Sequence, residues 1–299
     1  MNLIEILNWS IFSVAGLAAL AVIIAYFKSY FIIQPPRRRT PVKNHPDQYN
    51  LAYEIINFPT ADGLTLKGWF IPAADGETEK TIILCHGWGA NRGDLLRDTH
   101  FLAEKGFNLF YFDFRASGES AGSISSVGYL ETRDFDAAYD FLKTHRPHAM
   151  THAAVFGTSM GGSVAIFAAA KYPELKCLLA ENTFLSYRRG VSNWSWLRTK
   201  VPYYPMVPLT LAFVKMKLDA DPEPFSPMHN IDKVKTPVMF INGDHDDIVP
   251  LQDADTLYGM CKAEKKQMWI ITGASHGKCA EVGGEVYKNK VTQFFSENL

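Results

Sequence analysis

The sequence predicts an α/β protein with a mostly parallel central sheet, helices on both faces of the sheet, and one N-terminal transmembrane helix. Short apolar runs of strand length alternate with helical segments from about residue 80 onward, as in a buried parallel sheet. An uncharged apolar run from Ile6 to Phe27 precedes them. The aromatic-rich interval 181–236 has no clear strand, and long intervals of this kind usually form lids or binding segments. We expect a helical cap over about 182–230.

The composition is that of a folded and nearly neutral protein. Of 299 residues, 47% are hydrophobic and 20% are charged, and the formal net charge is -1. Disordered chains have fewer apolar residues and more net charge, and collagen-like or disulfide-scaffold proteins have far more glycine or cysteine. Those classes are excluded. Both signs of charge are spread along the chain, so no nucleic acid partner is expected.

The N-terminal apolar run has the length of a membrane span. As a helix, Ile6 to Phe27 is about 33 Å long, and a bilayer's hydrocarbon core is about 30 Å thick. Trp9 near one end and Tyr26 near the other suit the membrane interfaces. A buried core helix and a cleaved signal peptide are the alternatives. A signal peptide needs a basic start, whereas the only charged side chain before this run is Glu5.

Basic residues follow the run on its C-terminal side: Lys28, Arg37, Arg38, Arg39 and Lys43. The positive-inside rule therefore predicts a cytoplasmic domain. The four cysteines show no CxxC pairing and suit a reducing compartment: Cys85, Cys177, Cys261 and Cys279. The expected organisation is an anchor over 1–33, a proline- and arginine-rich linker over 34–49, and one domain over 50–299.

The elements of that domain can be predicted in order. The β-rich runs 51–58 and 64–71 flank an Ala-Asp-Gly turn, as in a hairpin. Buried strands are expected at 81–85, 107–112, 153–156, 177–180, 238–241 and 268–271. One buried helical face within 127–145 is formed by Phe135, Ala138, Tyr139 and Leu142. Because chemistry gathers at the carboxyl ends of parallel strands, residues just after each strand are the functional candidates.

The first candidate is Ser159, in the G-x-S-x-G sequence Gly157-Thr158-Ser159-Met160-Gly161 after the strand 153–156. This pattern places the serine on a sharp turn between a strand and a helix, where glycines let the backbone pass closely. Main-chain N–H groups at the following helix N-terminus favour a developing negative charge. Ser159 is therefore the expected nucleophile; the alternative is a structural glycine turn.

A serine nucleophile needs a base, and the base needs an acid that fixes its tautomer. His276 stands in a glycine-flanked loop after the last strand. An acidic turn after the strand 238–241 offers Asp244, Asp246 and Asp247. A metal site in this turn is the competing reading, but no second ligand cluster of suitable spacing supports it.

With these motifs, the chain resembles the α/β-hydrolase superfamily over nearly all of residues 50–299, including its serine aminopeptidase-like and esterase-like branches. The family's acid turn G-x-x-D-x-x-V-P is matched by Gly243, Asp246, Val249 and Pro250. The resemblance thus selects Asp246 as the acid. It also implies that the main-chain N–H groups of Trp88, in an H-G-x-G loop, and Met160 bind the oxyanion.

Two further features of the sequence have counterparts in this family, and one glycine-rich stretch also partly resembles a different motif. His86, which opens the H-G-x-G loop, is expected to brace that loop, and the turn Asp113–Ser120 to shape the site, with Ala116 where the family usually has glycine. A dinucleotide-binding motif at Gly87–Gly93 is an alternative interpretation, but that motif requires a glycine spacing one residue shorter than the spacing present here. That reading also leaves Ser159 unexplained.

The predicted function is a membrane-anchored serine hydrolase that cleaves carboxylic ester bonds through an acyl-enzyme intermediate. It requires no metal or organic cofactor. The expected partners are the membrane and a small-molecule acyl substrate. Esters of moderately hydrophobic acids, lipid-like ones among them, are the expected substrates, with slight support from proximity to lipid. The alternatives are an aminopeptidase-like amide hydrolase and a non-catalytic, membrane-tethered binding protein of the same fold.

Overall fold

The computed structural model describes residues 2–34 and 40–299. The strands are β1 (Glu54–Pro59), β2 (Thr65–Ile71), β3 (Lys80–Cys85), β4 (Asn108–Phe112), β5 (His152–Thr158), β6 (Leu178–Glu181), β7 (Val238–Gly243) and β8 (Lys266–Ile271). The α-helices are α1 (Leu3–Ile33), α2 (Arg92–Thr99), α3 (Glu131–His145), α4 (Met160–Lys171), α5 (Tyr187–Thr199), α6 (Tyr203–Leu218), α7 (Leu251–Met260) and α8 (Cys279–Asn298). Short 3-10 helices are η1 (Pro46–Tyr49), η2 (His100–Lys105), η3 (Glu223–Phe225), η4 (Pro227–His229) and η5 (Ile231–Lys233).

The strands form one sheet in the order β1-β2-β4-β3-β5-β6-β7-β8. Only the pairs β1–β2 and β2–β4 are antiparallel. The remaining pairs are parallel, and every residue of β4 and β7 is buried, which explains why those strands are continuous apolar runs. The predicted hairpin and all six further strands are present within a few residues of their expected positions, so the predicted fold class is confirmed.

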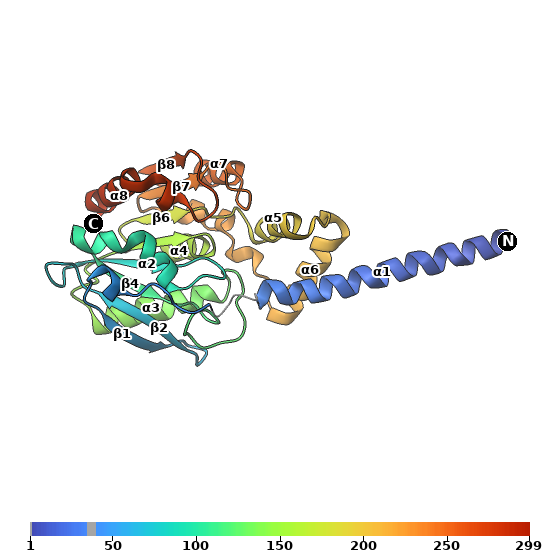
Figure 1. Ribbon diagram of the computed structural model, residues 1–299, viewed down its shortest axis with the longest axis horizontal. Helices are drawn as coiled ribbons and strands as arrows, with labels where there is room; N and C mark the ends of the chain where they lie inside the picture. Colours follow the sequence, from blue (N-terminus) through green and yellow to red (C-terminus); the bar gives the residue numbers. More distant parts are fainter. Residues whose placement is uncertain (1, 35–39) are drawn as a thin grey trace.

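Helices cover both faces of the sheet (Figure 1). Successive residues of β3 point to opposite faces of the sheet. Ile83 joins the core under α3, α4 and α7, whereas Ile82 joins the core under α2 and α8. The predicted buried face of α3 is confirmed, because Phe135, Ala138, Tyr139 and Leu142 are all buried. The four cysteines are buried and free.

The interval 181–236 contains α5, α6 and the three 3-10 helices η3, η4 and η5. It contains no strand after β6 ends at Glu181. In Figure 1, α5 and α6 stand away from the sheet, on the side from which α1 projects. We refer to α5 and α6 as the cap helices.

Helix α1 is long and apolar enough to cross a membrane, and most of it projects from the domain (Figure 1). It continues past Phe27 to Ile33, and its last turns pack on the cap helices. That packing was not expected from the sequence. Residues 35–39, part of the predicted linker, lie outside the described residues. The following segment contacts the domain, since Asn91 Nδ2 donates a hydrogen bond to Thr40 Oγ1 at 3.0 Å.

Candidate active site

Ser159 lies at the sharp turn between β5 and α4. Its backbone has φ 55° and ψ -118°, a strained conformation for a residue with a side chain. The neighbouring glycines make the turn possible. A Cβ on Gly157 would lie 2.1 Å from the Gly161 carbonyl oxygen, and one on Gly161 would lie 2.0 Å from the Cys85 carbonyl oxygen. The turn holds the Ser159 side chain clear of the sheet edge.

The structure brings together the three residues proposed from the sequence. His276 Nε2 lies 3.0 Å from Ser159 Oγ, and His276 Nδ1 lies 2.7 Å from Asp246 Oδ2. An ionised carboxylate can only accept a hydrogen bond, so the proton of neutral His276 belongs on Nδ1. Nε2 is then free to accept the proton of the Ser159 hydroxyl.

Asp246 is held by hydrogen bonds on both of its carboxylate oxygens. Oδ1 accepts the main-chain N–H groups of Ile248, at 2.9 Å, and Val249, at 2.8 Å. Oδ2 accepts Asn182 Nδ2 at 2.6 Å in addition to His276. The carboxylate is therefore buried but fully paired, and its orientation toward His276 is fixed.

The two other aspartates of the turn occupy different environments. Asp244 Oδ1 accepts the main-chain N–H of Gly273 at 2.6 Å and so ties the acidic turn to the loop that carries His276. Asp247 is exposed. A Cβ on Gly243 would lie 2.0 Å from the Ala274 carbonyl oxygen, so glycine is required where the two loops meet.

Asn182 is a site residue that the sequence reasoning missed. It follows β6 directly and has φ 48°, and its side-chain oxygen accepts a hydrogen bond from Cys279 Sγ at 2.9 Å. That contact leaves the amide nitrogen to face Asp246. The rule that function gathers after each strand would have found Asn182, since it is the first residue beyond the strand 177–180 and its neighbour Glu181.

The H-G-x-G loop passes directly beside the serine. A Cβ on Gly87 would lie 3.4 Å from Ser159 Cβ, which places Trp88 next to the nucleophile. Met160 is the first residue of α4, where main-chain N–H groups lack acceptors within the helix. These are the two residues whose main-chain N–H groups the family resemblance implies as oxyanion donors.

His86 braces this loop and is not placed to act as a base. Its Nδ1 pairs with the Gly87 carbonyl oxygen at 2.8 Å, and its Nε2 accepts the Phe114 N–H at 3.0 Å. Burial lowers the pKa of His86 below its usual value, so the ring stays neutral.

The turn from Asp113 is locked in the same way. Asp113 Oδ1 accepts the Arg92 N–H at 2.7 Å, and Oδ2 pairs with the Arg92 guanidinium and accepts the Glu119 N–H. Ala116 has φ 56°, in the left-handed region that glycine usually occupies. The residue that departs from the family pattern thus keeps the glycine-like conformation.

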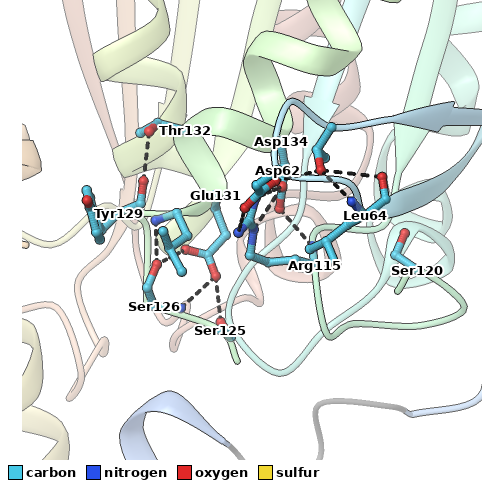
Figure 2. A network of polar contacts seen from close by, with 12 residues as sticks. Asp62, Leu64, Arg115, Ser120, Ser125, Ser126, Tyr129, Glu131, Thr132 and Asp134 are labelled. Carbon is cyan, nitrogen blue, oxygen red and sulfur yellow. Dashed lines mark hydrogen bonds and ion pairs between the residues drawn. The ribbon is translucent and has the colours of Figure 1, made fainter. Parts of the chain in front are cut away.

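A polar network supports the loop that follows (Figure 2). Glu131 accepts hydrogen bonds from Ser125, Ser126 and Gly128, all of them buried or nearly so. Beside it, the guanidinium of Arg115 bonds Asp134 at 2.7 Å. The Ser125 N–H also donates to the Ile33 carbonyl oxygen at 2.8 Å, so this network connects the loop to the end of α1.

Three hollows meet at Ser159. The first is a cavity of about 540 Å³ lined by Ile32, Trp88, Val127, Ser159, Met160, Phe184, Tyr187, Gly190, Val191, Trp194 and Ile248. The second, which we call the cleft, is about 1620 Å³, lies between α1 and the cap helices, and includes His276. The third is about 740 Å³ and lies on the α2 side. The lining of the first is apolar.

No metal-ligand cluster stands out in the part of the chain that the structure describes. Residues 2–34 and 40–299 contain no group of three or more His, Cys, Asp or Glu side chains that could hold a metal ion.

Comparison with known proteins finds a matching family model and several relatives. The family described as serine aminopeptidase, S33, matches residues 76–221. The uncharacterized protein YqkD of Bacillus subtilis is 25% identical over 287 residues, 93% of either chain. An uncharacterized membrane protein of Saccharomyces cerevisiae is 28% identical over 78% of either chain.

One solved structure has a similar fold over most of this chain. The esterase Pf2001 of Pyrococcus furiosus superimposes with a TM-score of 0.75 at 26% identity, over 89% of this chain and 98% of the esterase. The sheet order, the turn at Ser159 and these matches lead to one assignment: the chain belongs to the α/β-hydrolase superfamily.

Proposed function

We propose that this protein is a membrane-anchored serine hydrolase that cleaves carboxylic ester bonds. The observation that carries the proposal is the hydrogen-bonded chain from Ser159 through His276 to Asp246, at the mouth of an apolar cavity. The similarity to the Pyrococcus furiosus esterase supports the ester as the bond that is cleaved.

The reaction proceeds in two steps. His276 Nε2 takes the proton of Ser159 as Oγ forms a bond to the carbonyl carbon, and it returns that proton to the departing alkoxide as the ester bond breaks. Water then gives a proton to His276 and attacks the acyl-enzyme. Ser159 leaves with that proton, and the products are an acid and an alcohol. Asp246 orients His276 and stabilises its protonated form.

The tetrahedral intermediate needs donors for its oxyanion. The main-chain N–H groups of Trp88 and Met160 fulfil this role in the proposal, from the loop after β3 and the start of α4. Loss of one such donor typically reduces kcat by about 10²–10³.

Helix α1 supports the proposed membrane attachment. Its apolar run carries no charge between Ile6 and Phe27, and a yeast relative is named a membrane protein. By the positive-inside rule, the basic residues that follow the run favour the cytoplasmic side for the domain.

Amide hydrolysis is a second candidate, and one observation favours it. The third hollow reaches Ser159 and His276 and is lined by Asp94, Asp98 and Glu181, whose carboxyl groups could receive a free amine, and by Arg97, which pairs with Asp98. Burial, however, raises the pKa of Glu181 from its usual 4.5 to about 8, so this carboxyl is mostly protonated at neutral pH. An uncharged acid is a poor partner for an ammonium group, and the ester remains the favoured substrate.

The test is hydrolysis of p-nitrophenyl esters beside aminoacyl p-nitroanilides, with the full chain in detergent. We expect ester turnover that Ser159→Ala abolishes and that the matched variant Ser192→Ala, on α5 outside the three hollows, retains. Faster turnover of the anilides would select the amide function. The absence of any turnover would favour the non-catalytic binding protein.

A further inference from the structure

The end of α1 is built into the wall of the site. Its residues Ala25, Ser29, Ile32 and Ile33 form one buried stripe. Ile32 and Ile33 share an apolar cluster with Val207, Leu211 and Val214 of α6 and with Tyr187 and Val191 of α5. The span and the active site are therefore parts of one packed unit.

Two lysines fasten this helix end to the cap helices. Lys28 Nζ donates to Ser195 Oγ at 2.8 Å and to Thr199 Oγ1 at 2.7 Å, both on α5. From α6, Lys217 Nζ donates to the Tyr26 carbonyl oxygen at 3.1 Å and lies over the Tyr26 ring. Lys28 lines the cleft, whereas Lys217 lines none of the three hollows at Ser159.

The apolar cavity and the cleft differ in the charge of their linings. The apolar cavity has no charged side chain in its lining, and α1 contributes Ile32 to both hollows. Such a surface suits a hydrocarbon chain. The cleft contains His276, and Lys28 and Arg198 line it without any Asp or Glu.

The position of His276 decides which part of a substrate enters which hollow. His276 must give its proton to the leaving alcohol, and it lines the cleft and the third hollow but not the apolar cavity, so the alcohol lies outside that cavity. The third hollow has three acidic side chains in its lining and the cleft has none, so an anionic alcohol fits the cleft. The acyl chain then lies in the apolar cavity. An alcohol beside Lys28 and Arg198 is bound more tightly when it carries a phosphate, because charge-assisted hydrogen bonds are the strong ones.

The distance along α1 places both hollows at the membrane surface. Ile32 lies five residues beyond Phe27, the last residue of the uncharged run, which is about 7.5 Å along a helix. Bilayer headgroup layers are about 5–7 Å thick on each side of the hydrocarbon core. Trp196 and Tyr204 of the cap helices are 53% and 75% exposed, as suits side chains at that interface.

From these contacts we propose that the last turns of α1 form a wall of the active site, and that the substrate is an acyl ester of a phosphate-bearing membrane lipid. Its acyl chain lies against Ile32 in the apolar cavity, and its phosphate lies near Lys28 and Arg198 in the cleft. The inference deepens the proposed ester hydrolysis and rests on it. Ser159 forms an acyl-enzyme with the fatty acid and releases the phosphate-bearing alcohol, and water then releases the acid.

The test uses full-length protein in detergent micelles and three substrates: p-nitrophenyl butyrate, 1-palmitoylglycerol and 1-palmitoylglycerol 3-phosphate. Wild type should prefer the two palmitoyl esters to the butyrate, and the phosphate-bearing ester to its neutral counterpart. In Ile32→Ala, the ratio of kcat/KM for 1-palmitoylglycerol to that for butyrate should fall about tenfold, the effect of losing contact with roughly two methylene groups. In Lys28→Gln, the ratio for phosphorylated over neutral palmitoyl ester should fall by about tenfold or more.

Two control variants distinguish the loss of a substrate contact from a change in how α1 packs on the cap helices. Phe27→Ala changes an exposed side chain of α1 and should leave both ratios unchanged. Lys217→Gln removes the fastening on α6 and should also leave both ratios unchanged. Equal ratios in wild type, Ile32→Ala and Lys28→Gln, with butyrate still hydrolysed, would overturn this inference and keep the proposed function. Failure of wild type to hydrolyse any ester would overturn both.

Discussion

Asp246 and His276 are 30 residues apart, yet the aspartate carboxylate lies 2.7 Å from Nδ1 of the histidine ring. Two loops at the carboxyl edge of the sheet create this contact. One follows β7 and the other follows β8, and these strands are parallel neighbours. The close approach of Gly243 to Ala274 sets the distance between the loops. The contact makes the identity of the acid directly testable.

Asp246→Asn should reduce kcat for ester hydrolysis by about 10⁴, because an amide no longer fixes the tautomer in which Nε2 accepts the serine proton. The measurement is steady-state hydrolysis of p-nitrophenyl butyrate. Asp247→Asn is the matched control on an exposed side chain and should retain activity. The opposite pattern would assign the acid to Asp247.

Gly161→Ala should prevent a stable turn at Ser159. The added Cβ would lie 2.0 Å from the Cys85 carbonyl oxygen, a backbone atom that cannot move aside cheaply. Overpacking of this kind typically destabilises a protein by about 1–3 kcal/mol or more, which thermal unfolding should detect. Gly259→Ala, on α7, meets nothing within 4 Å and should be neutral or slightly stabilising. Equal melting temperatures for the two variants would contradict the close packing at Gly161.

Glu181→Gln should stabilise the protein at high pH and leave it unchanged at low pH. The folded-state pKa of Glu181 is about 8, against a usual 4.5, because the carboxyl is buried. The buried acid keeps its proton in the folded state, so its contribution is fully present below pH 4.5 and is lost as the pH rises toward 8. Gln imitates the protonated acid and can still accept the Tyr287 hydroxyl.

The measurement is the difference in melting temperature between Glu181→Gln and wild type, followed from pH 5 to pH 9 at roughly unit steps. The difference should be close to zero at the acidic end and should increase with pH. A difference that stays constant across this range would show that Glu181 ionises normally.

Truncation of α1 should distinguish its projecting N-terminal part from its C-terminal end, which packs on the cap helices. Removal of residues 2–24 leaves the buried stripe from Ala25 to Ile33 in place and should give a stably folded domain. Removal of 2–33 also deletes Ile32 and Ile33, whose burial contributes roughly 3–6 kcal/mol as an upper estimate. The longer truncation should therefore unfold at a clearly lower temperature. Equal stability of the two would mean that α1 does not dock on the cap helices.

Much of the fold could be predicted from the sequence because each buried strand is a short apolar run that can be recognised without neighbours. The same holds for Ser159 and His276, whose motifs are local. Asp246 required more, since three aspartates share its turn and only the resemblance singled one out. The structure shows a physical difference: Asp246 is buried and bonded to His276, whereas Asp247 is exposed.

The docking of α1 could not be predicted in this way. An apolar run has the pattern of a span whether or not its last turns pack on protein, and Lys28 has the pattern of a flanking charge. Its partners Ser195 and Thr199 are 167 and 171 residues away in the sequence, and nothing local marks them. Asn182 was missed for a related reason, because its role depends on the side chain it faces.

The central claim is that Ser159 is the nucleophile of an acyl-transfer reaction. The most direct measurement is labelling of the full-length protein with a fluorophosphonate, followed by mass spectrometry of its peptides. We expect a single modified site, at Ser159, in wild type and no labelling in Ser159→Ala. Modification of another residue, or undiminished labelling of Ser159→Ala, would contradict it.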